Sequence, residues 1–190
     1  MNPLERKGLI EFLQRVDRKL AKRTKALIIG GSAIALVYSP RYGTVDIDTI
    51  ETDRDFFVAC DKVNQETGSK VIVSPVTVAD TPYNYEDRLQ AVPIPGAKHL
   101  EVMVPEKHDL AMMKTLRGIG RDLEGVEAIH EASPLSAEKL IGLYTNEMSH
   151  AIGDKRTFRL NFLAAYARLF GEAEARKIEP TLPVLGEKRK

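Results

Sequence analysis

The chain has 190 residues, of which 43% are hydrophobic, and a formal net charge of +1, so it is long enough to bury a full core without disulfides or structural metals. Its single cysteine, Cys60, excludes an internal disulfide framework and a multi-cysteine zinc site. The first residues lack the apolar core of a signal peptide, and no segment approaches the ~20 apolar residues that span a bilayer. We therefore expect a cytoplasmic protein with no membrane partner.

The near-neutral total hides a charge gradient along the chain. Residues 1–25 hold 8 basic and 3 acidic residues, residues 26–154 hold 11 and 20, and residues 155–190 hold 9 and 4. An acidic centre with basic ends is typical of a cation-binding catalytic domain whose flanks guide a polyanion. Solvated helix faces give the same pattern, and the sequence alone leaves both interpretations open.

The first half of the chain alternates between helical and β patterns. Residues 1–24 contain apolar side chains at helical spacing and predict an amphipathic helix packed on the core. The following predicted elements are a strand at 25–30, a helix at 32–38, a loop at 39–43, a strand at 44–51, a helix at 54–66, and β runs at 71–73, 89–94 and 100–104. Asp53 and Gly68 are expected to cap the two ends of the helix at 54–66.

The second half of the chain reads as helices only. They are predicted at residues 109–117, 122–131, 136–152 and 155–177, each starting at an Asp or Ser or following a Gly break. An α/β half is thus followed by a helical half, and residues 181–190 form a basic tail.

Two carboxylates in the predicted strand at 44–51 are the strongest chemical signal. Asp46 and Asp48 occupy alternate positions, which puts both side chains on one face, about 7 Å apart along the backbone and able to share one divalent cation. A Gly30-Gly31-Ser32 turn precedes this strand and follows an apolar strand, where N–H groups and a hydroxyl can face a phosphate. Together the two features predict chemistry on a nucleotide, although a lone Asp-x-Asp also marks turns and exposed strand faces.

A third acid would complete such a cation site, because Mg²⁺ prefers octahedral oxygen coordination. Glu101 is the best candidate, since it interrupts the apolar run Leu100–Val104. A buried acid is costly without a partner, so Glu101 reaches a metal, pairs with a basic group or points to solvent.

These motifs, with Arg41 and Thr44 and the downstream segments at residues 109–114 and 121–124, resemble the nucleotidyltransferase-like domains of the DNA polymerase β superfamily. Within it the chain is most similar to AbiEii-type toxins of type IV toxin–antitoxin pairs and their uncharacterised relatives, over roughly residues 25–130. The resemblance implies an α+β fold, with a small mixed β-sheet core at residues 25–106, flanking helices and a helical region at 107–180.

The resemblance also implies roles for individual residues. Gly31 and Ser32, which follow Gly30 in the nucleotide-binding turn, face the triphosphate, and Asp46 and Asp48 bind Mg²⁺. Glu101, chosen from its place in the sequence, is the expected third catalytic metal ligand. Lys114 faces the nucleotide phosphates, and Arg121 and Asp122 lie near the same cleft. Arg41 and Thr44 touch the substrate, brace Asp46 or simply anchor their loop. Gly125 stands where relatives often carry a second Asp, and Glu101 replaces the usual Asp.

The spacing of three basic residues permits two interpretations. Lys114, Arg117 and Arg121 form one basic stripe if their helix continues through Gly118 and Gly120. If the helix breaks there, Arg121 belongs to a new helix with Asp122 in its first turn.

The sequence therefore predicts an enzyme that uses Mg²⁺ or Mn²⁺ to move a nucleoside monophosphate from an NTP to an acceptor hydroxyl. The expected acceptor is an RNA or tRNA end or a protein, and the expected setting is a toxin–antitoxin or phage-defence pair with a cognate antitoxin. The alternative is a weakly active or inactive protein of the same fold that acts as a binding partner or RNA-binding module.

Overall fold

The apolar run predicted at residues 25–30 forms the central strand of a mixed sheet. The computed structural model describes residues 3–77, 79–118 and 120–186, and within these residues five strands form one sheet. They are β1 (Thr24–Ile29), β2 (Asp46–Ile50), β3 (Ile72–Pro75), β4 (Gln90–Val92) and β5 (Leu100–Val104), in the order β3-β2-β1-β5-β4. β1 runs parallel to β5 and antiparallel to β2, β2 runs parallel to β3, and β4 runs antiparallel to β5. The predicted α+β fold with a small mixed sheet is confirmed.

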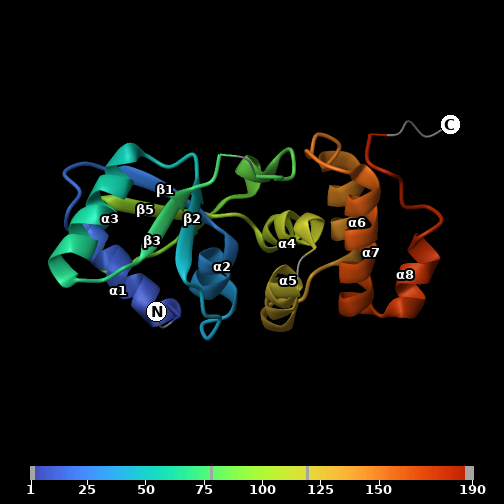
Figure 1. Cartoon of the computed structure of the whole chain (residues 1–190), viewed down its shortest axis with the longest axis horizontal. Helices are drawn as coiled ribbons and strands as arrows, with labels where there is room; N and C mark the ends of the chain where they lie inside the picture. The colour runs from blue at the N-terminus through green and yellow to red at the C-terminus, as the bar shows by residue number, and fades with distance from the viewer. Residues whose placement is uncertain (1–2, 78, 119, 187–190) are drawn as a thin grey trace. The chain divides into compact units, whose positions relative to one another are not determined.

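The chain divides into two compact units (Figure 1). The first comprises residues 1–78 and 89–105 and contains the sheet, and the second comprises residues 79–88 and 106–190. The segment 79–88, which lies inside the predicted core at 25–106, thus belongs to the second unit.

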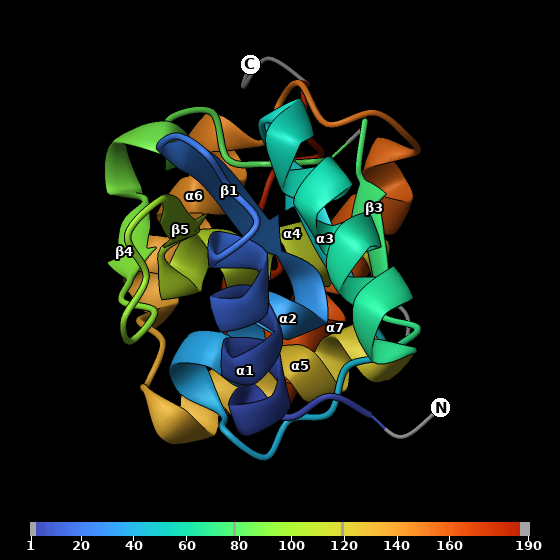
Figure 2. The same ribbon diagram turned by 90° about the vertical axis from the view of Figure 1, so that its left-hand side faces the viewer.

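Helices α1 (Arg6–Asp17) and α3 (Arg54–Thr67) lie on the same side of the sheet (Figure 2). They contact each other, α1 contacts β5 and α3 contacts β1. The apolar positions predicted for the first helix, Leu9, Phe12, Leu13 and Val16, are all buried. On β2 the side chain of Ile47 is completely buried, whereas Asp46 and Asp48, on the opposite face, are partly exposed.

A buried carboxylate joins α1 to the start of β5. Asp17 is 4% exposed and accepts backbone N–H bonds from Lys98 (3.0 Å), His99 (2.7 Å) and Leu100 (2.7 Å). Burial alone would raise the pKa of Asp17, but these hydrogen bonds outweigh burial and hold the pKa below its ordinary value.

Two predicted helix details differ from the structure. The helix expected at 32–38 begins two residues earlier, as α2 (Gly30–Ala33), and continues as a π-helical turn, η1 (Ile34–Tyr38). Gly68, with φ +68°, ends α3 as predicted, but Asp53 makes no side-chain cap. Its carboxylate instead accepts a hydrogen bond from the backbone N–H of Lys25, because the end of β2 lies beside the start of β1.

The second unit is helical, as predicted. Its helices are α4 (Lys107–Arg117), α5 (Gly120–Ala132), α6 (Ala137–Glu147), α7 (Lys155–Phe170) and α8 (Glu172–Ile178), with a short 3₁₀ turn, η2 (Tyr85–Arg88). The helix predicted at 155–177 is interrupted because Gly171 adopts a φ of +96°. Of the predicted basic tail at 181–190, residues 187–190 lie outside the described residues. No helix in the described part of the chain is long and apolar enough to cross a membrane.

An ion cluster attaches the segment 79–88 to the helices of the second unit. The guanidinium of Arg88 donates to Asp109 on α4, with Nη2 2.7 Å from Oδ1, and to Glu147 on α6, with Nη2 2.7 Å from Oε2. Burial raises the pKa of Asp109, which is completely buried, and Arg88 opposes this shift. This cluster lies between distant sequence segments and has no local sequence signal.

Candidate active site

The turn between β1 and α2 needs glycine for two separate reasons. Gly30 has a φ of +65°, a left-handed conformation that side chains with a Cβ rarely adopt. A Cβ at Gly30 would also lie 3.0 Å from Oδ2 of Asp48. The carboxylate of Asp48 therefore packs directly against the glycine turn, and the register agrees, since Asp48 pairs with Ile29.

The next glycine lies against the loop that enters β2. A Cβ at Gly31 would lie 2.9 Å from Oγ1 of Thr44 and 3.4 Å from Cε1 of Tyr42. The turn and the loop thus approach each other too closely for a larger residue. Gly30, Gly31, Ser32, Thr44, Asp46 and Asp48, all predicted as site residues, are brought together in the first unit.

Two buried hydroxyls hold the acid strand in place. Ser32 is 1% exposed and Thr44 is 2% exposed. The Ser32 hydroxyl donates to the carbonyl oxygen of Asp46 at 2.5 Å, and Thr44 Oγ1 lies 3.1 Å from the same carbonyl and 3.2 Å from Asp46 Oδ1. Of the roles left open for Thr44, the geometry is that of a brace for Asp46.

The two carboxylates have the chemistry that a hard cation needs. Asp46 and Asp48 lie on one face of β2 beside Ile72 and Ser74 of β3, and both are partly exposed. Carboxylate oxygens are preferred ligands of Mg²⁺, which commonly takes its other positions from water and substrate phosphates. The pair therefore fits a cation shared with a nucleotide. Among the described residues, no group of three or more His, Cys, Asp or Glu side chains gathers to hold a metal.

Glu101 does not lie with the acid pair. On β1, Glu101 pairs with Lys25 and Asp48 pairs with Ile29. Lys25 and Ile29 are four residues apart, so the two acids are separated by ~13 Å along the strand direction. Arg23 binds Glu101 instead, with Nη2 3.1 Å from Oε2. On the face of the sheet that bears the acids, the β5 residue paired with β1 nearest to Asp48 is Met103, which pairs with Leu27. The structure thus favours the basic-partner interpretation of Glu101 over the metal-ligand one.

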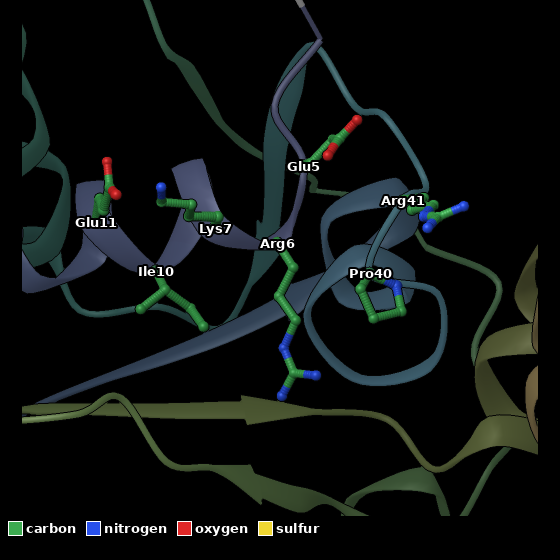
Figure 3. Close-up of a pocket in the computed structure, with 7 residues that line it drawn as sticks. All are labelled: Glu5, Arg6, Lys7, Ile10, Glu11, Pro40 and Arg41. Atoms are coloured by element: carbon green, nitrogen blue, oxygen red, sulfur yellow. The ribbon is translucent and has the colours of Figure 1, made fainter.

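Arg41 lines a groove of about 540 Å³ in the first unit (Figure 3). Its other lining residues come from the turn at Pro40 and from the first turns of α1: Glu5, Arg6, Lys7, Ile10 and Glu11. The groove carries charges of both signs, so its composition selects no ligand class.

Lys114 and Asp122 come together in the second unit. Lys114 Nζ lies 3.0 Å from Asp122 Oδ1, and Arg117 Nη2 lies 2.7 Å from the same oxygen. Oδ2 of Asp122 is buried with no hydrogen-bond partner among the described residues. Helix α4 ends at Gly118, which has a φ of +65°, so the continuous basic stripe does not form. Arg121 lies in the first turn of a separate helix, α5.

A mixed sheet that places a Gly-Gly-Ser turn against an Asp-x-Asp strand defines a nucleotidyltransferase-like domain. The chain belongs to the family described as nucleotidyltransferase of unknown function (DUF6036), whose profile matches residues 7–171. The match extends beyond residues 25–130, where the sequence motifs lie, and covers helices of both units. No curated protein and no solved structure matches the chain. The family description gives no toxin role, so the AbiEii-type assignment stays a prediction.

Proposed function

We propose that the protein is a Mg²⁺-dependent nucleotidyltransferase that moves a nucleoside monophosphate from an NTP to an acceptor hydroxyl. The observation that carries the proposal is the contact between the Asp48 carboxylate and the Gly30 turn, on the strand face that also bears Asp46. This contact puts the proposed cation ligands beside the proposed phosphate-binding turn.

In the proposed reaction the acceptor oxygen attacks the α-phosphorus in line. The new O–Pα bond forms as the bond from Pα to the bridging oxygen of the β-phosphate breaks, pyrophosphate leaves, and the hydroxyl proton passes to water. Mg²⁺, bound through Asp46 and Asp48, would neutralise charge on the phosphates. The protein contributes position and field: Gly31 and Ser32 offer backbone N–H groups, and Ser32 and Thr44 fix Asp46.

The proposal extends to the acceptor and the biological setting. An RNA or tRNA end fits the basic flanks of the sequence, and a protein hydroxyl fits the same chemistry. A toxin–antitoxin or phage-defence role, with a cognate antitoxin as partner, is proposed on the sequence resemblance alone.

Label transfer tests the proposal. The protein is incubated with each labelled NTP, Mg²⁺ and total tRNA or lysate, beside an Asp46→Ala/Asp48→Ala variant. Glu101→Gln is the matched control, because it removes an acid from the same sheet outside the pair. We expect the wild type and Glu101→Gln to label an acceptor and the double variant to fail. Label incorporation by the double variant, or by none of the three, contradicts the proposal.

One observation favours the alternative of a binding protein without catalysis: only two carboxylates gather at the site among the described residues. Titration of each NTP with and without Mg²⁺ separates the alternatives, because an inactive fold without a cation site lacks a metal-dependent component of binding. RNA binding that is sensitive to salt but unchanged in the double variant would indicate an RNA-binding module.

A further inference from the structure

The chain leading into α1 is hydrogen-bonded to the loop that enters the acid strand. The backbone N–H of Leu4 donates to the carbonyl of Thr44 at 2.6 Å, and the N–H of Thr44 donates to the carbonyl of Leu4 at 3.0 Å. The two residues form an isolated antiparallel bridge, 40 positions apart in sequence. This bridge adds no strand to the sheet, and it fixes the backbone of a single residue of the loop, Thr44.

Two further contacts hold the same segments together. The N–H of Arg6 donates to the carbonyl of Pro40 at 3.2 Å, at the junction drawn in Figure 3. A Cβ at Gly43 would lie 2.7 Å from Cβ of Pro3, so the chain crosses the loop at a glycine. Residues 3–6, called here the amino-terminal strap, therefore contact the loop at three points.

The strap reaches the candidate cation site through one side chain. Thr44 has its backbone paired with Leu4 and its Oγ1 within 3.2 Å of Asp46 Oδ1. Because a threonine side chain is stiff at χ1, fixing the Thr44 backbone also fixes the direction of its hydroxyl. The Thr44 hydroxyl also lies against Gly31, where an added Cβ would press on Thr44 Oγ1.

From this continuous set of contacts we infer that the amino-terminal strap positions the Asp46 carboxylate through Thr44. Thr44 is a positioning residue, and Leu4 holds it. The inference rests on the proposed function for its consequence, which is cation-dependent nucleotide binding. Its structural part, the coupling of Leu4 to residues 44–48, stands independently.

The test compares two substitutions with their matched controls. Leu4→Pro removes the N–H that bonds to Thr44, whereas Leu4→Ala keeps both backbone bonds. Thr44→Val removes the hydroxyl at nearly the same shape, whereas Thr44→Ser keeps it. Gly43→Ala places a Cβ against Pro3 and so displaces the strap through a change in the loop. It replaces Leu4→Pro in the test if Leu4→Pro does not fold.

Two readouts are measured on the full chain. The first is amide hydrogen exchange at residues 44–48. The second is Mg²⁺-dependent affinity for non-hydrolysable analogues of the four NTPs. We expect Leu4→Pro and Thr44→Val each to weaken the metal-dependent affinity by about three- to tenfold, the effect of one lost hydrogen bond. The Leu4→Pro/Thr44→Val double variant should bind no more weakly than Thr44→Val alone, since both substitutions act on one contact. Leu4→Ala should match the wild type, and Thr44→Ser, which keeps the hydroxyl but loses the stiff χ1, should lose less affinity than Thr44→Val.

The exchange readout keeps the inference separate from the proposed function. Faster exchange at residues 44–48 in Leu4→Pro or Gly43→Ala supports the strap even if the wild type binds no NTP, a result that would overturn only the proposed function. Unchanged exchange in these variants overturns the inference. Additive losses of affinity in the double variant also overturn it, because the strap and the hydroxyl would then act independently.

Discussion

Lys114 Nζ lies 3.0 Å from Asp122 Oδ1, and both side chains are more than nine-tenths buried. Removing the lysine would leave a buried carboxylate, and Arg117, its other cationic partner in the described contacts, is more than half exposed. We therefore expect Lys114→Met to lower the free energy of unfolding by about 3 kcal/mol in chemical denaturation. Arg117→Met, at the solvent end of the cluster, should cost less than about 1 kcal/mol.

The same variants separate a structural lysine from a phosphate ligand. A Lys114→Met/Asp122→Leu double variant should recover much of the lost stability, because it removes both charges. If Lys114→Met instead keeps its stability and loses NTP binding, the role implied by the sequence resemblance is correct and the structural interpretation is wrong.

The acids on the sheet should differ sharply in their effect on cation binding. Asp46→Asn and Asp48→Asn are expected to weaken Mg²⁺-dependent NTP binding by at least about 100-fold, a larger effect than loss of an outer-shell partner. Glu101→Gln should change it less than about twofold, because Glu101 pairs with Arg23 away from the pair. Isothermal titration calorimetry measures all three. A large loss in Glu101→Gln would restore the glutamate as a metal ligand.

Cation binding should depend on nucleotide. Two carboxylates leave most of an octahedral shell to water, so replacing some of that water with phosphate oxygens should tighten binding. We expect Mn²⁺, followed by electron paramagnetic resonance, to bind weakly alone and at least about tenfold more tightly with a non-hydrolysable NTP analogue. Tight binding of Mn²⁺ alone would mean that the site has further protein ligands.

Alanine at the two turn glycines should damage the site. Gly30→Ala is strained at a φ of +65° and presses on Asp48, and Gly31→Ala presses on Thr44. We expect each to cost about 1–3 kcal/mol of stability and to abolish metal-dependent nucleotide binding. Gly142→Ala is the control, because its Cβ meets nothing within 4 Å and helix α6 gains a better helix former. Thermal unfolding with and without nucleotide measures both effects.

Acid should weaken the second unit through Glu106. Burial alone would raise the pKa of this carboxyl, but hydrogen bonds with His108 and the charge of Lys139 lower it from 4.5 to about 2. Because the folded-state pKa is the lower one, the stabilisation is complete above about pH 4.5 and is lost as the pH falls towards 2. It amounts to at most about 3 kcal/mol. Denaturation midpoints from pH 6 to pH 2.5 should fall more steeply for the wild type than for Glu106→Gln. Parallel curves would contradict the assignment.

The features that the sequence determined are local ones. Gly30-Gly31-Ser32 follows an apolar run, and Asp46 and Asp48 alternate in a β pattern, so the turn and the shared strand face follow from backbone periodicity. The burial of one face of the first helix follows from the same periodicity, and the helix end at Gly68 follows from the left-handed conformation that glycine tolerates. The interruption at Gly171 was missed because a glycine within a long helical pattern is compatible with both outcomes until packing selects one.

The position of Glu101 was decided only by the tertiary structure, because the pairing of β1 with β5 sets which residues are level with Asp48. The bridge between Leu4 of the amino-terminal strap and Thr44, and the Arg88 cluster, also join residues far apart in sequence, and no local pattern encodes such contacts. The two interpretations of the basic stripe were separated by the left-handed backbone conformation of Gly118, where helix α4 ends. The sequence by itself thus determined which residues share a strand face or a turn. The tertiary structure decided which carboxylates lie near one another, because strand register and chain crossings depend on the packing of the whole unit.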